Sequence, residues 1–143
     1  MTTAKYTVLF IFSLSIFAWI GLVQAQEPKM VKLPDGEEVV DISGEWDAQI
    51  ENYGPWSKYG SYTNVIKITW EGNSFVGTRM KFDKFHFPDS VAFRGEIDKD
   101  GIKKLQYMTD AGPNDTKAEI SEYGNKIIMD DGESLKITLT RKK

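Results

Sequence analysis

Short runs in which apolar and polar residues alternate fill the chain from Val39 to Arg141 and constrain its fold more than any other feature. In the clearest run, Ile42–Ile50, the apolar residues lie on one face and polar residues separate them. This period of two is that of a β-strand with one buried face, because no helix would gather those residues on one side. Most runs are joined by short turns that contain glycine, and no amphipathic helical stretch of useful length interrupts them. The sequence therefore predicts an all-β domain.

Eight strand candidates follow one another along this part of the chain. They are residues 42–51, 64–71, 74–83, 91–98, 102–110, 116–122, 126–130 and 134–141. Because short turns join consecutive strands, the pattern favours an antiparallel up-and-down meander. Closing the meander buries its apolar face and removes both open edges, so we predict an eight-stranded β-barrel. A two-sheet β-sandwich is the alternative, because periodicity alone does not distinguish the two.

The strand predicted over residues 74–83 has an ambiguous inward face. Either the odd-numbered residues Phe75, Gly77 and Arg79 point inward, or the even-numbered residues from Val76 to Phe82 do. A bulge at Gly77 would let the strand switch between the two. We expect Arg79 to be an exposed strand residue. Residues 83–90 are predicted to be a connection between strands, and residues 111–115 are predicted to be a turn.

The first 25 residues differ from the rest of the chain. Lys5 precedes an uncharged run over residues 8–23, and Val23-Gln24-Ala25 follows with the small residues of a cleavage site. A basic, an apolar and a small-residue region in this order are typical of a secretory signal peptide. The apolar run is shorter than the roughly 20 residues of a membrane span, although an uncleaved anchor is the alternative. We predict a signal peptide over residues 1–25, export to the periplasm or the extracellular space, and no stable membrane span after cleavage.

Residues 26–38 contain two prolines and a Pro-Asp-Gly turn, which predicts an extended or disordered N-terminal segment. A single barrel domain is predicted to follow over residues 39–143. The chain has no cysteine, so it forms no disulfide and no thiolate metal site. Its formal net charge of −3 does not indicate nucleic-acid binding. We expect a monomer that is held together by packing and by a closed hydrogen-bond network.

Gly44 and Trp46 form a Gly-x-Trp motif on the first strand of the predicted meander, and Arg141 ends the last strand in the parity of its inward residues. In this context the chain resembles the calycins, the superfamily of lipocalins, fatty-acid-binding proteins and avidins. Residues 66–78 also resemble a hairpin of small lipocalin-like and avidin-like barrels. The resemblance implies that Gly44, Trp46 and Arg141 are structural, with Trp46 as a plug at one barrel end and Arg141 packed across its ring. It further implies a lipocalin-like protein that binds a small ligand.

An aromatic loop over residues 53–62 is the most unusual local feature of the chain. Tyrosine and tryptophan concentrate at recognition surfaces because they offer a large contact area with few torsions to freeze. We predict that Trp56, Tyr59 and Tyr62 contact a ligand at the barrel mouth; the alternative is that they close the mouth as a lid. Phenylalanines around His86 are predicted to form the opposite lip, at positions 82, 85 and 87.

Trp70, Phe93 and Tyr107 are predicted to line the barrel and to contribute to ligand binding. An eight-stranded barrel is either filled by side chains or holds one small ligand, and its large inward aromatics favour a filled interior. His86 is the only histidine, and with no cysteine beside it we expect a surface residue rather than a metal or haem ligand. No metal, cofactor or catalytic residue is predicted, and no catalytic motif occurs.

Two functional hypotheses follow from these patterns. The first is a secreted, non-enzymatic protein that binds a small apolar or aromatic ligand at the mouth framed by residues 53–62. The second is a protein-interaction or inhibitor module of the same fold, which would recognise a protein partner through that loop.

Overall fold

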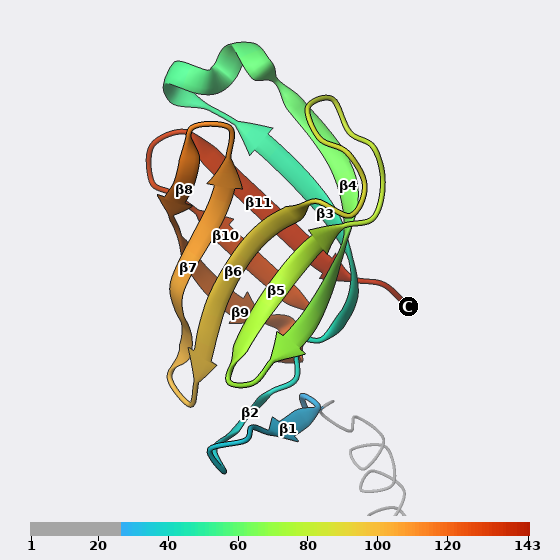
Figure 1. Cartoon of the computed structure of the whole chain (residues 1–143), viewed down its shortest axis with the longest axis vertical. Coiled ribbons are helices and arrows are strands. Elements are labelled where there is room, and N and C mark those ends of the chain that lie inside the picture. The colour runs from blue at the N-terminus through green and yellow to red at the C-terminus, as the bar shows by residue number, and fades with distance from the viewer. Residues whose placement is uncertain (1–26) are drawn as a thin grey trace, which may run out of the picture.

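The computed structural model describes residues 27–143, and the predicted signal peptide over residues 1–25 lies outside them (Figure 1). Strands dominate the described residues, and two short 3₁₀-helices interrupt them. In chain order the elements are β1 (Met30–Lys32), β2 (Glu38–Val40), β3 (Gly44–Asn52), η2 (Gly54–Tyr59), β4 (Ser61–Glu71), β5 (Ser74–Arg79), β6 (Val91–Asp98), β7 (Gly101–Thr109), β8 (Gly112–Asp115), β9 (Lys117–Ser121), η3 (Glu122–Gly124), β10 (Lys126–Asp130) and β11 (Leu135–Arg141). Within residues 27–143 no helix has the length and apolar character needed to cross a membrane.

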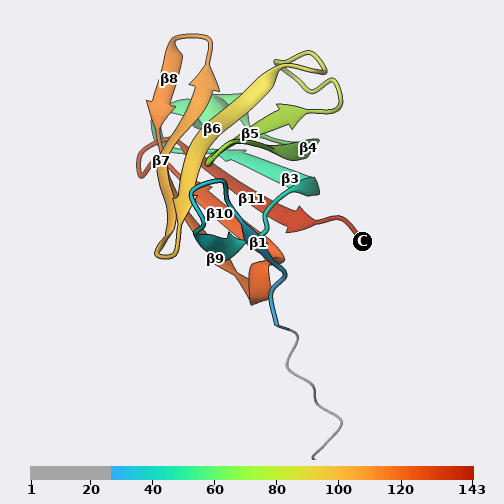
Figure 2. The ribbon, with the colours of Figure 1, turned by 60° about the horizontal axis from the view of Figure 1, so that its bottom comes forward.

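Nine strands form one antiparallel sheet that curves into a nearly closed barrel (Figures 1 and 2). Neighbours in the sheet follow the order β8-β7-β6-β5-β4-β3-β11-β10-β9, so the last strand of the chain pairs with β3. The end strands β8 and β9 are consecutive in sequence, and the Thr116 N–H between them donates to the Leu105 carbonyl at 3.0 Å. Because β9 also packs against β7, the two ends of the sheet meet. The predicted antiparallel meander barrel is confirmed, and the chain does not form the alternative sandwich.

The barrel has nine strands rather than the predicted eight, because β8 lies where the sequence predicts a turn. β8 pairs antiparallel with β7: Gly112 lies opposite Thr109, and Asp115 lies opposite Gln106. β8 shows no apolar alternation, and it contains Pro113, which is tolerated because β8 is an edge strand with one free side. Such a strand forms where β7 offers an open edge, and the local periodicity of residues 111–115 does not reveal that edge.

The hairpin β1–β2 lies at the end of the barrel opposite η2 (Figures 1 and 2). It uses most of the segment that the sequence predicts to be extended or disordered. Leu33 and Val39 of this hairpin are buried in the same core as Ile42 and Trp46. The hairpin therefore covers the barrel end that we call the floor.

At the floor, Arg141 lies across Trp46 as the resemblance implies. Trp46 is fully buried, and the Arg141 guanidinium carbon is 4.3 Å from the centroid of its ring. Gly44 has a φ of 113°, a backbone conformation that favours glycine, beside this arginine. The guanidinium also donates to three backbone carbonyls, those of Ser43 at 2.9 Å, Asp41 at 2.7 Å and Gly124 at 2.9 Å. The cation–π contact and these hydrogen bonds tie the two ends of the barrel sequence together.

β5 resolves the ambiguous inward face in favour of Phe75, Gly77 and Arg79. Phe75 is fully buried and Arg79 is only 3% exposed, so the expectation of an exposed Arg79 is wrong. Polar groups satisfy the buried guanidinium: it donates to the Val91 carbonyl at 2.8 Å, the Ser90 hydroxyl at 3.2 Å and the Tyr107 hydroxyl at 3.1 Å. These partners come from two other parts of the chain, Ser90 and Val91 at the start of β6 and Tyr107 in β7, which is why strand parity alone does not predict the burial. The register between β5 and β6 shifts at Gly77, where the sequence places a bulge.

Side chains fill the barrel between its floor and its mouth. Phe75 and Phe93 pack edge to face with centroids 6.2 Å apart. Beside Phe93, Arg79 and Ile137 the remaining space measures about 10 Å³, no more than a single water occupies. The interior is thus packed, as its content of large aromatics predicts.

The Asp131 carboxylate organises the turn between β10 and β11 and links it to β8. It accepts the backbone N–H groups of Glu133, Ser134 and Leu135, the Ser134 hydroxyl and the Asn114 side-chain amide, all within 2.6–2.9 Å. Burial opposes ionisation here, but these hydrogen bonds outweigh it and hold the pKa of Asp131 well below its ordinary value.

Replacing Asp131 with asparagine should lower the free energy of unfolding by about 2 kcal/mol at pH 7, because an amide cannot accept all these hydrogen bonds. Since the folded pKa lies below the unfolded one, the wild-type advantage is complete above about pH 5 and shrinks as the pH falls below about 4. Urea unfolding at pH 7, 5 and 3 measures this difference. Asp100→Asn, at an exposed turn carboxylate, is the control and should change stability by less than about 0.5 kcal/mol. A pH-independent effect of Asp131→Asn would contradict the conclusion that the ionised Asp131 carboxylate stabilises this turn.

Candidate functional site

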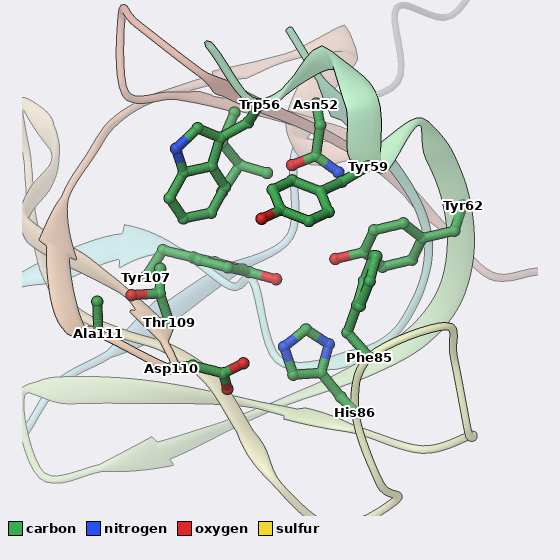
Figure 3. Close-up of a pocket in the computed structure, with 11 residues that line it drawn as sticks. Asn52, Trp56, Tyr59, Tyr62, Phe85, His86, Tyr107, Thr109, Asp110 and Ala111 are labelled. Carbon is green, nitrogen blue, oxygen red and sulfur yellow. The ribbon is translucent and has the colours of Figure 1, made fainter.

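A cavity of about 240 Å³ opens at the mouth of the barrel, the end opposite the hairpin β1–β2 (Figure 3). Three segments surround it: η2, the loop of residues 80–90 between β5 and β6, and the turn from β7 to β8. Aromatic side chains make up most of its wall, and a few polar groups interrupt them. The lining residues are Asn52, Trp56, Tyr59, Tyr62, Phe85, His86, Tyr107, Thr109, Asp110, Ala111 and Leu135.

The first wall is η2, which the sequence builds as an isolated turn of 3₁₀-helix. Pro55 lies in the first turn of the helix, and Gly60 ends it with a φ of 69°. The Asn52 side-chain amide donates to the Gly60 carbonyl at 2.9 Å, which closes the loop at its base. Trp56 and Tyr59 are 39% and 38% exposed, and their rings pack edge to face with centroids 5.8 Å apart. The helix therefore holds two large rings at the mouth instead of burying them in the core.

The second wall is the loop of residues 80–90, which brings Phe85 against the first wall. The Phe85 ring lies 5.7 Å from Tyr59 and 5.5 Å from Tyr62, both in edge-to-face geometry. These contacts make one continuous aromatic cluster from Trp56 to Tyr62. Edge-to-face packing holds each ring in place, so the cluster forms a preorganised surface.

Asp83 fixes the conformation of that loop. Its carboxylate accepts the backbone N–H groups of Phe85 and His86 and the Asn64 amide, and it lies 3.0 Å from Nδ1 of His86. Burial opposes its ionisation, but these hydrogen bonds lower the pKa of Asp83 below its ordinary value. The anchored carboxylate orients the His86 ring along the cavity wall, where Figure 3 shows it.

The bottom of the cavity is formed by the phenols of Tyr62 and Tyr107, whose hydroxyl groups point toward each other in Figure 3. Behind them, Arg79 donates to the Tyr107 hydroxyl at 3.1 Å. Burial, and next the neighbouring Tyr107 phenol, raise the pKa of Tyr62 above its ordinary value. The Tyr62 phenol is therefore protonated at every pH at which a protein of this kind would work.

Four of the six residues predicted to bind a ligand line this cavity: Trp56, Tyr59, Tyr62 and Tyr107. Trp70 and Phe93 do not. Trp70 lies toward the floor, where its indole N–H donates to the Asp41 carboxylate at 3.2 Å, and Phe93 is fully buried in the packed interior. Alternation along a strand gives the direction of a side chain but not its depth in the barrel, so it cannot separate these positions.

The opposite lip is only partly the one expected from the sequence. Phe85 and His86 line the cavity, so His86 belongs to the wall and is not a plain surface residue. Phe82 and Phe87 instead point away, are 69% and 74% exposed, and pack on each other with centroids 5.6 Å apart.

Sequence reasoning misses the rim formed by the turn from β7 to β8. Thr109, Asp110 and Ala111 reach the cavity because β8 folds back on β7, and these residues have the composition of an ordinary turn. Nothing in their local sequence distinguishes them from the other turns of the chain.

Comparison with protein-family models, curated proteins and solved structures finds no match to this chain. Among residues 27–143 no group of three or more histidine, aspartate and glutamate side chains is placed to hold a metal ion.

Proposed function

We propose that this protein is an exported, non-enzymatic, lipocalin-like monomer that binds a small aromatic ligand at the mouth of its barrel. The observation that carries the proposal is the cavity of about 240 Å³ walled by Trp56, Tyr59, Tyr62 and Phe85. A cavity of about 150 Å³ accepts benzene, so this one has room for about two fused rings. A concave site lined by apolar and aromatic side chains with a few polar groups is the usual form of a small-molecule site.

Three further features support the proposal. The nearly closed antiparallel barrel is compatible with a calycin-like fold, and Trp46 and Arg141 make the contact that calycins use at the floor. The leader predicted over residues 1–25 supports export. The packed interior supports a binding site at the mouth rather than in the middle of the barrel.

Truncation of Trp56 tests the proposal. A naphthalene-based fluorophore should bind the wild type with a change in tryptophan fluorescence, and Trp56→Ala should weaken that binding about tenfold by removing one wall. The matched control is Phe87→Ala, which removes an exposed aromatic ring outside the cavity and should leave the affinity unchanged. Failure of the wild type to bind any bicyclic aromatic probe would reject the proposal, as would equal affinities of the wild type and Trp56→Ala.

The exposure of the aromatic rim favours a second candidate, a protein-interaction or inhibitor module. Trp56 and Tyr59 keep more than a third of their surface in solvent, and the exposed pair Phe82 and Phe87 lies in the adjoining loop. Exposed aromatic side chains near one another are typical of protein interfaces. Under this candidate, Trp56→Ala and Tyr59→Ala would abolish capture of the partner while the barrel stays folded, and unchanged capture would reject it.

A further inference from the structure

We propose that the cavity selects an uncharged, planar aromatic ligand with a carbonyl oxygen, which accepts a hydrogen bond from the tyrosine pair Tyr62 and Tyr107. This inference rests on the proposed function and specifies the chemical class of its ligand. It follows from the protons, the charges and the shape of the described residues around the cavity.

A count of the hydroxyl protons indicates that the pair Tyr62 and Tyr107 has an O–H group free to donate. A guanidinium group only donates, so in the contact with Arg79 the Tyr107 oxygen is the acceptor and its own proton points elsewhere. The two phenols carry two hydroxyl protons, and a hydrogen bond between the two phenols would use at most one of them. No hydrogen bond within residues 27–143 takes either hydroxyl proton to a group outside the pair. One O–H therefore remains to donate into the cavity, and the group that satisfies it must be an acceptor.

The charges favour a neutral acceptor over an anion. At the Tyr62 phenol the field of Asp83 opposes negative charge more strongly than the field of Arg79 favours it. Asp110 adds a further carboxylate at the rim. An anionic ligand would lose its hydration without a net electrostatic gain, which is unfavourable. A cation without a lone pair would leave the free O–H of the tyrosine pair without an acceptor, and the attraction of the exposed Asp110 is screened by solvent.

The shape of the cavity favours a flat ligand of limited size. Trp56, Tyr59 and Phe85 meet edge to face, so ring faces and edges alternate around the opening. Flat aromatic molecules pack well against such a surface. The volume of about 240 Å³ fits about two fused rings, with the carbonyl directed down to the tyrosine pair.

Four bicyclic probes of similar size separate these properties: chromone, naphthalene, 2-naphthoate and N-methylquinolinium. Isothermal titration calorimetry should show that chromone binds the wild type at least about tenfold more tightly than either charged probe. Tyr62→Phe/Tyr107→Phe should weaken chromone binding about tenfold and naphthalene binding less than twofold, because only chromone uses the donor. Each single variant keeps one hydroxyl and should show a smaller loss. Phe87→Ala is the matched control and should leave all four affinities unchanged.

A second measurement on the wild type makes the test independent of how well the double variant folds. The carbonyl stretching band of bound chromone should shift to lower wavenumber than in an apolar solvent, as it does when the oxygen accepts a hydrogen bond. An unshifted band, or equal effects of the double variant on chromone and naphthalene, would overturn the inference while leaving the proposed function intact. Tighter binding of 2-naphthoate than of chromone would also overturn it. Failure of all four probes to bind would reject the proposed function itself.

Discussion

Replacing Trp46 with alanine is expected to lower the free energy of unfolding by about 3–5 kcal/mol. The indole is fully buried at the floor of the barrel, and its N–H donates to the Ile42 carbonyl at 3.0 Å. Truncation leaves a cavity, frees that carbonyl and removes the aromatic surface on which the Arg141 guanidinium lies. Urea unfolding followed by circular dichroism measures the loss.

Two variants make this prediction specific to the floor. Trp46→Phe keeps an aromatic ring under Arg141 but loses the indole hydrogen bond and some volume, so we expect a smaller loss of about 1–2 kcal/mol. Trp56→Ala removes the same side chain from the exposed rim and should change stability by less than about 0.5 kcal/mol. Equal losses for Trp46→Ala and Trp56→Ala would contradict the assignment of Trp46 as the residue that closes the floor.

Strand periodicity predicts the fold well because each barrel strand has one inward face. The alternation over Ile42–Ile50 corresponds to β3, and the parity of Arg141 correctly directs it toward Trp46. β8 could not be predicted in this way, because its pairing depends on the free edge of β7. The burial of Arg79 could not be predicted from periodicity either, because it depends on acceptors supplied by Ser90, Val91 and Tyr107.

The candidate site was less predictable than the fold because it joins loops that lie far apart in the sequence. The composition of η2 alone indicates Trp56 and Tyr59. Neither the place of His86 in the wall nor that of Asp110 at the rim follows from local sequence, since each depends on how its loop folds back over the barrel mouth. The cavity and the Trp46–Arg141 contact lie at opposite ends of the barrel. Rim residues can therefore change without loss of the buried contacts that stabilise the fold.

Adding one methyl group to Gly77 should destabilise the barrel nearly as much as removing a large side chain. A Cβ atom at this position would lie 2.3 Å from Cζ of Phe93, a ring that is itself fully buried. The ring cannot retreat, because Phe75 packs against it with a centroid distance of 6.2 Å. We therefore expect Gly77→Ala to lower the free energy of unfolding by about 3 kcal/mol, as measured by urea unfolding.

A smaller partner should relieve this clash. In Gly77→Ala/Phe93→Leu the shorter side chain makes room for the new methyl group, so the double variant should be more stable than the sum of the two single losses predicts, by about 1–3 kcal/mol. Thr78→Ala, at the next residue of β5, is the control and should show no such coupling to Phe93→Leu. Additive losses in the double variant would mean that Gly77 is not required by the approach of the Phe93 ring. The coupling therefore tests directly whether aromatic rings pack against bare backbone in the interior beneath the mouth.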